Sequence, residues 1–539
     1  MEIIDNKALL IRTRSPDKYS VIPRSKIIEE HADGSSSVVV FWGLDEVRVL
    51  KNLGVKNVPS PITRKYNWPG RYTPMEHQLE TAAFLTLNRK AFVFSEPGTG
   101  KTLSALWAAD YLMQRGEIRR VLILCPLSIM QSAWMGDISN SIIHRSAIIA
   151  HHPQASRRIE MIQKDYEIVI TNYEGLNLIA DEVTANGKFD LVIVDEANAY
   201  KTMSTKRWKA LQSIIKPSTF LWMMTGTPAS QSPVDAYGLA KLVNPEGVPK
   251  FFTAWRDKVM NKLTMFKWVA KPDAKNLVFE ALQPAIRYTK AQCLDLPPVV
   301  TVTREVPMTP QQTKYYNLLK EKQSVYAAGE TISAVNAAAV VSKLLQISCG
   351  AAYTDDHEVV EFDASPRLRV LEEILEETDR KVLIFALFRS SIDAVHTHLL
   401  KRGISTECIH GSVPASKRGD IIKRFQTEAA PRVLVMQPQA SAHGITLTAA
   451  DTVVFYGPLM SVEQYVQCIA RADRKGQDAA KVTVIHIEGS AIEKKMFKAL
   501  QTNVSSHALL TQMFDMEIKN YKELQTRQTC VNCQTLDKQ

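Results

Sequence analysis

The stretch AFVFSEPGTGKTLSALWAADYLMQR, residues 91–115, decides the fold. An apolar run of strand length is followed by the loop EPGTGKT (96–102) and then by a segment with helical spacing of apolar residues. A strand, a glycine-rich loop and a helix in this order place backbone N–H groups and a helix N-terminus around a phosphate. We therefore predict a phosphate-binding loop made of Glu96, Pro97, Gly98, Thr99, Gly100, Lys101 and Thr102.

Two side chains of this loop have expected roles. Lys101 would contact the terminal phosphates of a nucleotide, and Thr102 would hold Mg²⁺. Ser95 stands where the first glycine of the pattern G-x-x-x-x-G-K-[ST] is usual, and a small residue there can leave the cradle intact. The alternative is a glycine turn that only opens a structural helix, which the flanking strand and helix make the weaker interpretation.

Further apolar runs resemble buried parallel strands. They are VLILCP (121–126), EIVITN (167–172), DLVIVDEA (190–197) and FLWMMTG (220–226), and then KVLIFA (381–386), STECIHG (405–411), RVLVMQ (432–437), DTVVFYG (451–457) and KVTVIHI (481–487). Runs of this kind, separated by amphipathic helices, are typical of parallel sheets covered on both faces. The sequence thus predicts an α/β fold with two tandem parallel-sheet lobes and helical insertions.

The chain is expected to have five parts. They are a small strand-rich α+β accessory module (1–65), a nucleotide-binding first lobe (66–292), a connector with the break LDLPPVV (293–310), a second lobe (311–505), and a C-terminal helix with a polar tail (506–539). The proline-containing segment 59–72 is expected to be a linker. Trp134, Trp208, Trp222 and Trp255 are expected in the core.

Two carboxylates end the strand DLVIV. Asp195 and Glu196 lie where the edge of a parallel sheet meets a ligand. Asp195 would coordinate Mg²⁺, and Glu196 would orient or deprotonate an attacking water. Carboxylates at a strand end can instead form a structural turn, but downstream of a phosphate loop the pair indicates nucleoside triphosphate hydrolysis.

Two arginines occur in QCIARADRKGQ (467–477). Arg471 and Arg474 are three residues apart, so we expect them on one helical face, where two guanidiniums suit the phosphate charge of a transition state. A solvated basic face is the alternative.

A series of ordered segments together resembles the Swi/Snf-type double-stranded DNA translocases of helicase superfamily two, over about residues 70–505. Besides the motifs above they include PMEHQ with Gln78, LILCPLSIMQSAW, ITNYEGL, MMTGTPAS, RYTKAQCLDLPPV, KLLQISCG, CIHGS and ASAHGITLTAADTVVFY. The resemblance implies two RecA-like lobes, the first binding ATP with Gln78 and the second contributing Gly444 and the two arginines. It also implies duplex contacts, for which the candidates are Ser128, Thr171, Asn172, Lys201, Lys206, Arg389, Ser412 and Ser441.

Two motifs depart from the family pattern. Asn198 stands where the DEAH histidine is usual, which changes how hydrolysis is coupled to lobe closure. Ser441 and Ala442 replace the usual Gly-Gly pair before Gly444, so a close backbone approach there is less assured. Neither change removes a phosphate, metal or water ligand, and we expect an active ATPase that uses ATP and Mg²⁺.

The amino-acid composition limits the classes of partner and of cellular environment that suit the chain. Lys and Arg total 66 against 56 Asp and Glu, a net charge of +10, which suits a polyanionic partner. Seven scattered cysteines argue against a disulfide framework, and no stretch reaches membrane-spanning length. We expect a cytoplasmic monomer, in a bacterial nucleoid or a phage-infected cell, acting on double-stranded or branched DNA, with replication or recombination proteins as candidate partners. The alternatives are a strand-separating DNA or RNA helicase and a non-catalytic nucleic-acid-binding protein.

Overall fold

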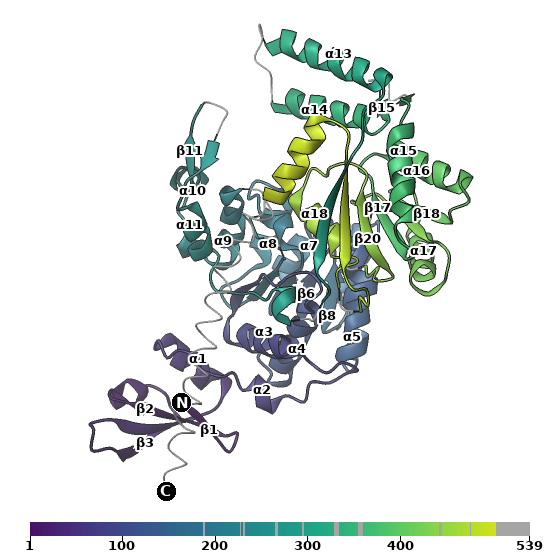
Figure 1. Ribbon diagram of the computed structural model, residues 1–539. Coiled ribbons are helices and arrows are strands. Elements are labelled where there is room, and N and C mark those ends of the chain that lie inside the picture. The colour runs from purple at the N-terminus through teal and green to yellow at the C-terminus, as the bar shows by residue number, and fades with distance from the viewer. Residues whose placement is uncertain are drawn as a thin grey trace. The chain divides into compact units, whose positions relative to one another are not determined.

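The computed structural model describes residues 1–502 apart from 187–188, 227, 230–231, 265–267, 294–295, 328–333, 354–358, 441–444 and 475. The chain divides after Cys293 into two compact units, which we call the first lobe, with its N-terminal module, and the second lobe (Figure 1). None of the described helices is long and apolar enough to cross a lipid bilayer.

The first lobe is built on a seven-stranded parallel sheet of order β13-β5-β10-β9-β6-β8-β7. Its strands are β5 (Lys90–Val93), β6 (Val121–Leu124), β7 (Ala147–Ile149), β8 (Ile168–Thr171), β9 (Leu191–Val194), β10 (Phe220–Met224) and β13 (Ala285–Ile286). The five predicted strands are confirmed. The edge strands β7 and β13 were not predicted, because two or three residues are too few to show a periodicity.

Helices cover both faces of this sheet. They are α3 (Glu76–Leu87), α4 (Lys101–Gln114), α5 (Gly136–Ser141), α6 (Ala155–Gln163), α7 (Tyr173–Asn186), α8 (Lys206–Ile214), α9 (Ala236–Val243), α10 (Phe252–Val259) and α11 (Ala274–Ala281). Alternate strand residues enter separate cores: Phe92 and Phe94 lie in one, Ala91 and Val93 in the other. A strand with apolar side chains on both faces reads as a continuous apolar run, which is why the sequence signal was clear. The four expected core tryptophans are all buried.

The N-terminal module is an antiparallel sheet of order β1-β2-β4-β3. It contains β1 (Glu2–Ile4), β2 (Ala8–Thr13), β3 (Ser25–Glu30), β4 (Ser36–Phe41) and the helix α1 (Leu44–Asn52). The helix α1 fastens the module to the lobe: Leu44 joins a lobe core, and Arg48 donates to the Thr86 carbonyl (2.8 Å) and pairs with Glu117 (2.6 Å). The module is therefore packed on the lobe as a fixed brace.

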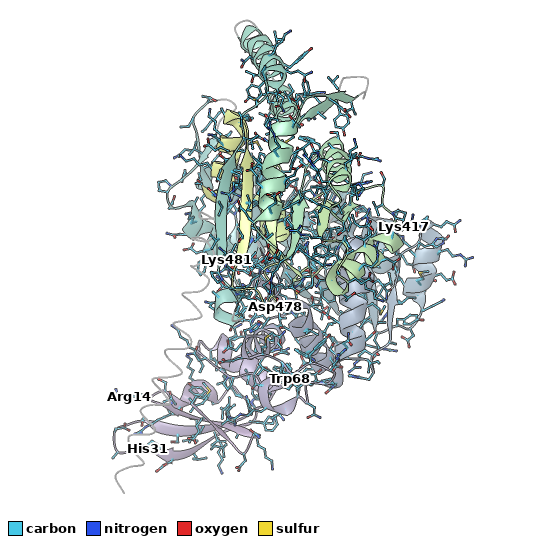
Figure 2. All side chains as sticks on the ribbon, turned by 45° about the vertical axis from the view of Figure 1, so that its right-hand side comes forward. Arg14, His31, Trp68, Lys417, Asp478 and Lys481 are labelled. Carbon is cyan, nitrogen blue, oxygen red and sulfur yellow. The ribbon has the colours of Figure 1, made fainter. Side chains whose placement is uncertain are left out.

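The expected linker 59–72 is instead a strap packed on the lobe. Tyr66 OH donates to the buried Asp110 carboxylate (2.5 Å), and Trp107 Nε1 donates to the Pro69 carbonyl (3.1 Å). The Trp68 ring meets those of Tyr66 and Trp107 edge-on. Trp68 is labelled in Figure 2. Gly70 has φ +108°, and a Cβ there would overlap the Ser141 backbone. Aromatic side chains thus make a proline-rich segment without periodicity part of the core.

The second lobe is a six-stranded parallel sheet of order β14-β21-β20-β17-β19-β18. Its strands are β14 (Val299–Glu305), β17 (Lys381–Phe385), β18 (Thr406–Ile409), β19 (Val433–Met436), β20 (Ala450–Phe455) and β21 (Val482–Glu488). Five of them match predicted strands. The sixth, β14, lies within the expected connector 293–310, because the β-branched run VVTVTRE pairs with β21 along its whole length.

Helices of the second lobe are α13 (Pro310–Ala327), α14 (Ala334–Ser348), α15 (Ser365–Glu376), α16 (Arg389–Lys401), α17 (Ala415–Thr427) and α18 (Val462–Ile469). A further helix covers residues 491–502 at the end of the second lobe, and the predicted C-terminal helix and polar tail (506–539) lie outside the described residues. A buried bidentate ion pair holds the helix at 491–502: Arg367 Nη2 lies 2.7 and 2.9 Å from the two Glu493 carboxylate oxygens.

One buried histidine gives the second lobe a pH dependence. His486 is fully buried, its Nε2 bonds to Tyr465 OH (2.9 Å), and its ring stacks on Phe497 at 4.1 Å. Burial lowers its pKa from 6.5 to about 4. Below pH 6.5 the unfolded chain takes up a proton that the folded lobe takes up only near pH 4, so stability falls as the pH falls through this window.

We expect His486 to account for a loss of about 3 kcal/mol of unfolding free energy between pH 6.5 and pH 4. Urea unfolding followed by circular dichroism should show this loss for the wild type and a correspondingly smaller loss for His486→Gln, which cannot titrate. Comparing the two proteins cancels the contributions of other groups. Equal losses in both would show that His486 is not the titrating group.

Candidate active site

The phosphate loop has the backbone that phosphate binding requires. Gly98 and Gly100 have φ angles of +91° and +80°, and α4 begins at Lys101, within the last residues of the loop. The positive φ at Gly100 favours glycine, and a Cβ there would in addition displace the Gln78 side-chain amide. Gln78 and His77 of α3 line the loop, with His77 Nε2 bonded to the Thr99 carbonyl oxygen (2.7 Å).

Lys101 lies over its own loop. Its Nζ donates to the carbonyl oxygens of Ser95 (2.7 Å) and Glu96 (3.2 Å). The ammonium group therefore lies against the first residues of the loop, and its contact with the terminal phosphates of a nucleotide stays a prediction.

The segment after β13 clamps the loop from the side, an arrangement that sequence reasoning missed. The Ser95 hydroxyl accepts the Tyr288 N–H (3.1 Å), and Glu96 accepts the Lys290 N–H (3.0 Å) and pairs with the buried Arg287 (3.3 Å). The motif RYTK at 287–290 was the available signal, but the resemblance assigned it to the connector. Ser95, which stands where glycine is usual, thus uses its hydroxyl to hold the segment after β13 against the loop.

Ser95→Ala is expected to leave the Tyr288 N–H without its acceptor, at a cost of about 1–3 kcal/mol in first-lobe stability. All eight tryptophans lie before residue 293, so tryptophan fluorescence during urea unfolding reports this lobe. Ser141→Ala is the matched control, because Ser141 is equally buried but bonds only within its own helix. Equal, small effects of both changes would contradict the clamp.

Asp195 and Glu196 follow β9 at the same edge of the sheet. Trp134 Nε1 donates to Asp195 Oδ2 (3.1 Å), and the Glu196 N–H donates to Asp195 Oδ1 (3.0 Å). Tyr173 OH donates to the Asp195 carbonyl oxygen (2.6 Å). Burial and the neighbouring Glu196 carboxylate raise the pKa of Asp195. Trp134 and Tyr173 therefore hold the Asp195 segment in place, a role that the expectation of Trp134 as a core residue did not suggest.

Three loops meet at this edge. Since β10 lies between β5 and β9, the loop that follows it reaches the phosphate loop, and a Cβ on Gly226 would lie 2.7 Å from Pro97 Cδ. Glu196 has φ +47°, a left-handed backbone that non-glycine residues adopt at some energetic cost and that is common at functional turns. The Thr102 hydroxyl and the Asp195 carboxylate are hard oxygen ligands suited to Mg²⁺ held jointly with nucleotide phosphates.

The candidate nucleic-acid contacts of the first lobe differ in how far their side chains are exposed to solvent. Thr171 is fully buried and its hydroxyl donates to the Ala150 carbonyl (3.0 Å), so its side chain does not serve as a surface contact. Asn172 is partly exposed and is positioned by Arg158 (3.0 Å), and Lys201 pairs with Asp235 (3.2 Å). Lys206 is exposed at the start of α8. The side chain of Ser128 lies outside the described part of the chain.

In the second lobe two candidates come together. Arg389 Nη1 donates to Ser412 Oγ (2.9 Å), and both side chains are exposed. Residues 441–444, which include Ser441 and Gly444, are not among the described residues.

The two candidate arginines converge without sharing a helix. The helix α18 ends at Ile469, so the expected common helical face is wrong: Arg471 and Arg474 lie in the turns that follow. Both guanidiniums nevertheless donate to the Ile445 carbonyl oxygen, Arg471 from 3.4 Å and Arg474 from 3.3 Å. Arg471 is buried and Arg474 is partly exposed.

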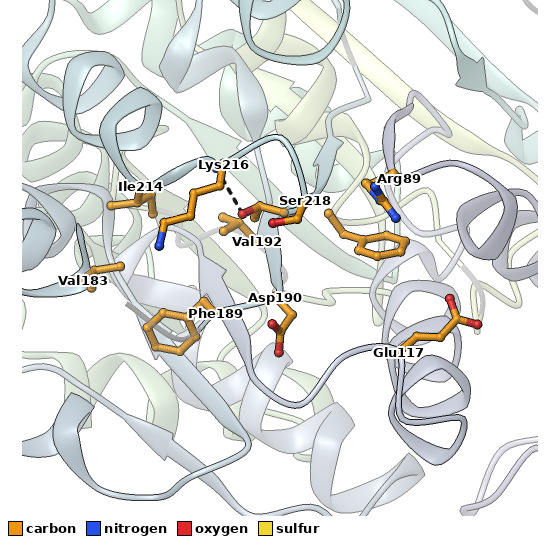
Figure 3. A pocket seen from close by; sticks show the side chains of 11 residues that line it. Arg89, Glu117, Val183, Phe189, Asp190, Val192, Ile214, Lys216 and Ser218 are labelled. Carbon is orange, nitrogen blue, oxygen red and sulfur yellow. Dashed lines mark hydrogen bonds between the residues drawn. The ribbon is translucent and has the colours of Figure 1, made fainter. Parts of the chain in front are cut away.

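A pocket at the opposite edge of the first sheet has no such chemistry (Figure 3). Arg89, Asp190 and Thr219, which line it, immediately precede β5, β9 and β10, so it opens at the amino ends of the strands. The Asp190 carboxylate accepts the N–H groups of Arg119 (2.7 Å) and Arg120 (3.1 Å) and so closes the turn into β6. The pocket is therefore set apart from the site described above.

Two family models match the chain: the SNF2-related domain over residues 76–350 and the helicase conserved C-terminal domain over residues 366–476. The chain is 25% identical to the Mus musculus "Chromodomain-helicase-DNA-binding protein 1-like", over 75% of this chain and 46% of that protein. It is also 26% identical to a Caenorhabditis elegans "SWI/SNF-related matrix-associated actin-dependent regulator of chromatin subfamily A-like protein 1 homolog". This match covers 81% of this chain and 62% of that protein.

A phage relative is of similar length. "Putative protein p41" of Acyrthosiphon pisum secondary endosymbiont phage 1 is 25% identical over 74% of this chain and 88% of its own. The chain spans only about half the length of the animal relatives it matches. Among solved structures, the Sulfolobus solfataricus SWI2/SNF2 ATPase core in complex with dsDNA is 19% identical over 84% of this chain and 97% of that one, with a TM-score of 0.40.

Proposed function

This chain belongs to the SNF2-related family, and from that premise we propose that it is an ATP-hydrolysing motor that moves along double-stranded or branched DNA. One observation carries the proposal. The ends of β5, β9 and β10 bring the phosphate loop, the Asp195–Glu196 pair and the loop at Gly226 to one edge of a sheet, in a chain that matches the models of both lobes.

The residues suggest how hydrolysis proceeds. Backbone N–H groups of residues 98–102 and the Lys101 ammonium bind the phosphates of ATP, while Thr102 and Asp195 hold Mg²⁺. The metal ion, when bound, neutralises charge on the transferring phosphate. Glu196 orients the attacking water and accepts its proton. Arg471 and Arg474 supply positive charge to the phosphates when the second lobe closes, which links each turnover to lobe movement.

The grip on DNA is proposed to be independent of sequence. Asn172, Lys201, Lys206, Arg389 and Ser412 offer amide, ammonium, guanidinium and hydroxyl groups, which bind phosphates without reading bases. The net charge of +10 favours such a polyanion. The match to a phage protein over 88% of that protein's length supports a setting in a bacterial or phage-infected cell. We propose that the protein acts there as a monomer in DNA replication, recombination or repair.

The test is steady-state ATP hydrolysis by the full chain alone and with duplex DNA, single-stranded DNA or RNA. We expect strong stimulation by duplex, and no strand separation on a simple flanked duplex. Preferential stimulation by single strands or RNA, with unwinding, would replace the translocase by a strand-separating helicase. Absence of hydrolysis under every condition would leave a nucleic-acid-binding protein without catalysis.

A further inference from the structure

Residues 250–275 form a projection from the first lobe, which we call the basic projection. It consists of α10, the hairpin of β11 (Met260–Lys262) and β12 (Trp268–Ala270), and the start of α11. Figure 1 shows the β11 hairpin extending beyond α10 and α11, away from the sheet of its lobe. None of the roles proposed above uses these residues.

The projection is anchored next to the candidate site. Trp255 of α10 is fully buried and its Nε1 donates to the Pro233 carbonyl (3.3 Å). Two residues further on, Asp235 pairs with Lys201, one of the candidate phosphate contacts. The base of the projection is therefore fixed at the carboxyl edge of the first sheet.

Charge is concentrated on this segment. Its 26 residues include seven Lys or Arg and two Asp, a net charge of +5, half of the net charge of the whole chain. Lys250, Lys258 and Lys262 are exposed, and within the described residues no carboxylate forms an ion pair with them. A positive field on a protruding element is suited to a polyanion.

Apolar rings are interleaved with these charges. Phe251 is 65% exposed, with Lys250 Nζ at 5.5 Å from its ring centre, and Leu263 at the hairpin is 59% exposed. The Trp268 ring lies 4.1 Å from the Arg256 guanidinium carbon and 6.0 Å from Lys262 Nζ. Rings beside cations bind unpaired bases, whose faces are accessible, whereas duplex phosphates need the cations alone.

We propose that the basic projection binds single-stranded nucleic acid, with Lys258 and Lys262 on the phosphates and Phe251 against a base. This inference rests on the proposed duplex motor. Together, the two proposals imply a preferred substrate in which a single-stranded arm adjoins the duplex. An acidic protein surface could pair with the lysines of the projection, but it would offer no base to stack on the aromatic rings beside them.

The experiment measures binding of fluorescent oligo(dT) to the full chain by anisotropy over a range of salt concentrations. Neutralising both lysines, Lys258→Gln with Lys262→Gln, should weaken binding and lower the salt slope by about 1.4, the value for two phosphate contacts on a single strand. Phe251→Ala should weaken binding about tenfold, and Phe251→Trp should retain it. ATP hydrolysis at saturating blunt duplex should not change.

Arg119→Gln with Lys216→Gln is the matched control, because it removes the same charge from exposed residues at the amino edge of the first sheet. Its oligo(dT) binding should equal that of the wild type. Wild-type affinity and slope in both the lysine and Phe251→Ala variants, or an equal loss in the control, would overturn the proposal. Since this assay contains no ATP and no duplex, a failure of the motor proposal would appear separately, as absent duplex-stimulated hydrolysis.

Discussion

Glu196→Gln is expected to lower duplex-stimulated ATP hydrolysis by about 10²- to 10⁴-fold, the usual contribution of a general base. The amide keeps the shape of the side chain but cannot accept a proton from water. The Glu196 N–H bond to Asp195 Oδ1 (3.0 Å) comes from the backbone, so the substitution leaves in place the carboxylate that we propose as a metal ligand. ATP binding should therefore remain near the wild-type value.

The measurements are kcat with saturating duplex and the Kd of a fluorescent ATP analogue. Glu160→Gln is the control, because Glu160 lies on α6 outside the proposed site and its carboxylate is exposed. It should hydrolyse ATP at the wild-type rate. A Glu196→Gln variant that retained most of its activity would show that another group activates the water, and a variant that lost ATP binding would show a structural role for Glu196.

The sequence predicted correctly those features that depend on residues close together along the chain. The strand β9 and the two carboxylates after it could be inferred because four apolar residues buried on both faces must end at a sheet edge, where polar groups meet ligands. The backbone of the phosphate loop could be inferred for the same reason. Its glycines are required by the loop itself, as the positive φ angles at Gly98 and Gly100 show.

Contacts between distant segments could not be inferred. The clamp on the phosphate loop joins Ser95 and Glu96 to residues more than 190 positions later, and β13, which delivers it, is too short to have a pattern. Thr171 shows the same limit, since nothing in ITNYEGL tells whether its hydroxyl faces DNA or, as observed, the Ala150 carbonyl. The strap at 59–72 resembled a linker because its packing depends on individual aromatic side chains without a period.

Arg474→Ala is expected to lower kcat with duplex by about 10³-fold while changing the affinity for ATP little. An arginine that serves the transition state carries a charge that matters most as the terminal phosphate leaves, so its loss affects turnover more than binding. Arg474 is the better test of the pair, because it is partly exposed whereas Arg471 is 6% exposed and its truncation would also disturb the core.

Arg474→Lys separates charge from geometry. A lysine keeps the charge but cannot present two N–H groups in one plane, so the proposal requires that it recover little of the lost rate. Arg402→Ala is the matched control, since Arg402 is an exposed arginine of the same lobe that pairs with Glu372 (2.8 Å), and it should turn over normally. Full recovery by Arg474→Lys would mean that a point charge suffices. Unchanged kcat in Arg474→Ala would leave Arg474 as a structural support for the turn after α18, where it donates to the Ile445 carbonyl (3.3 Å).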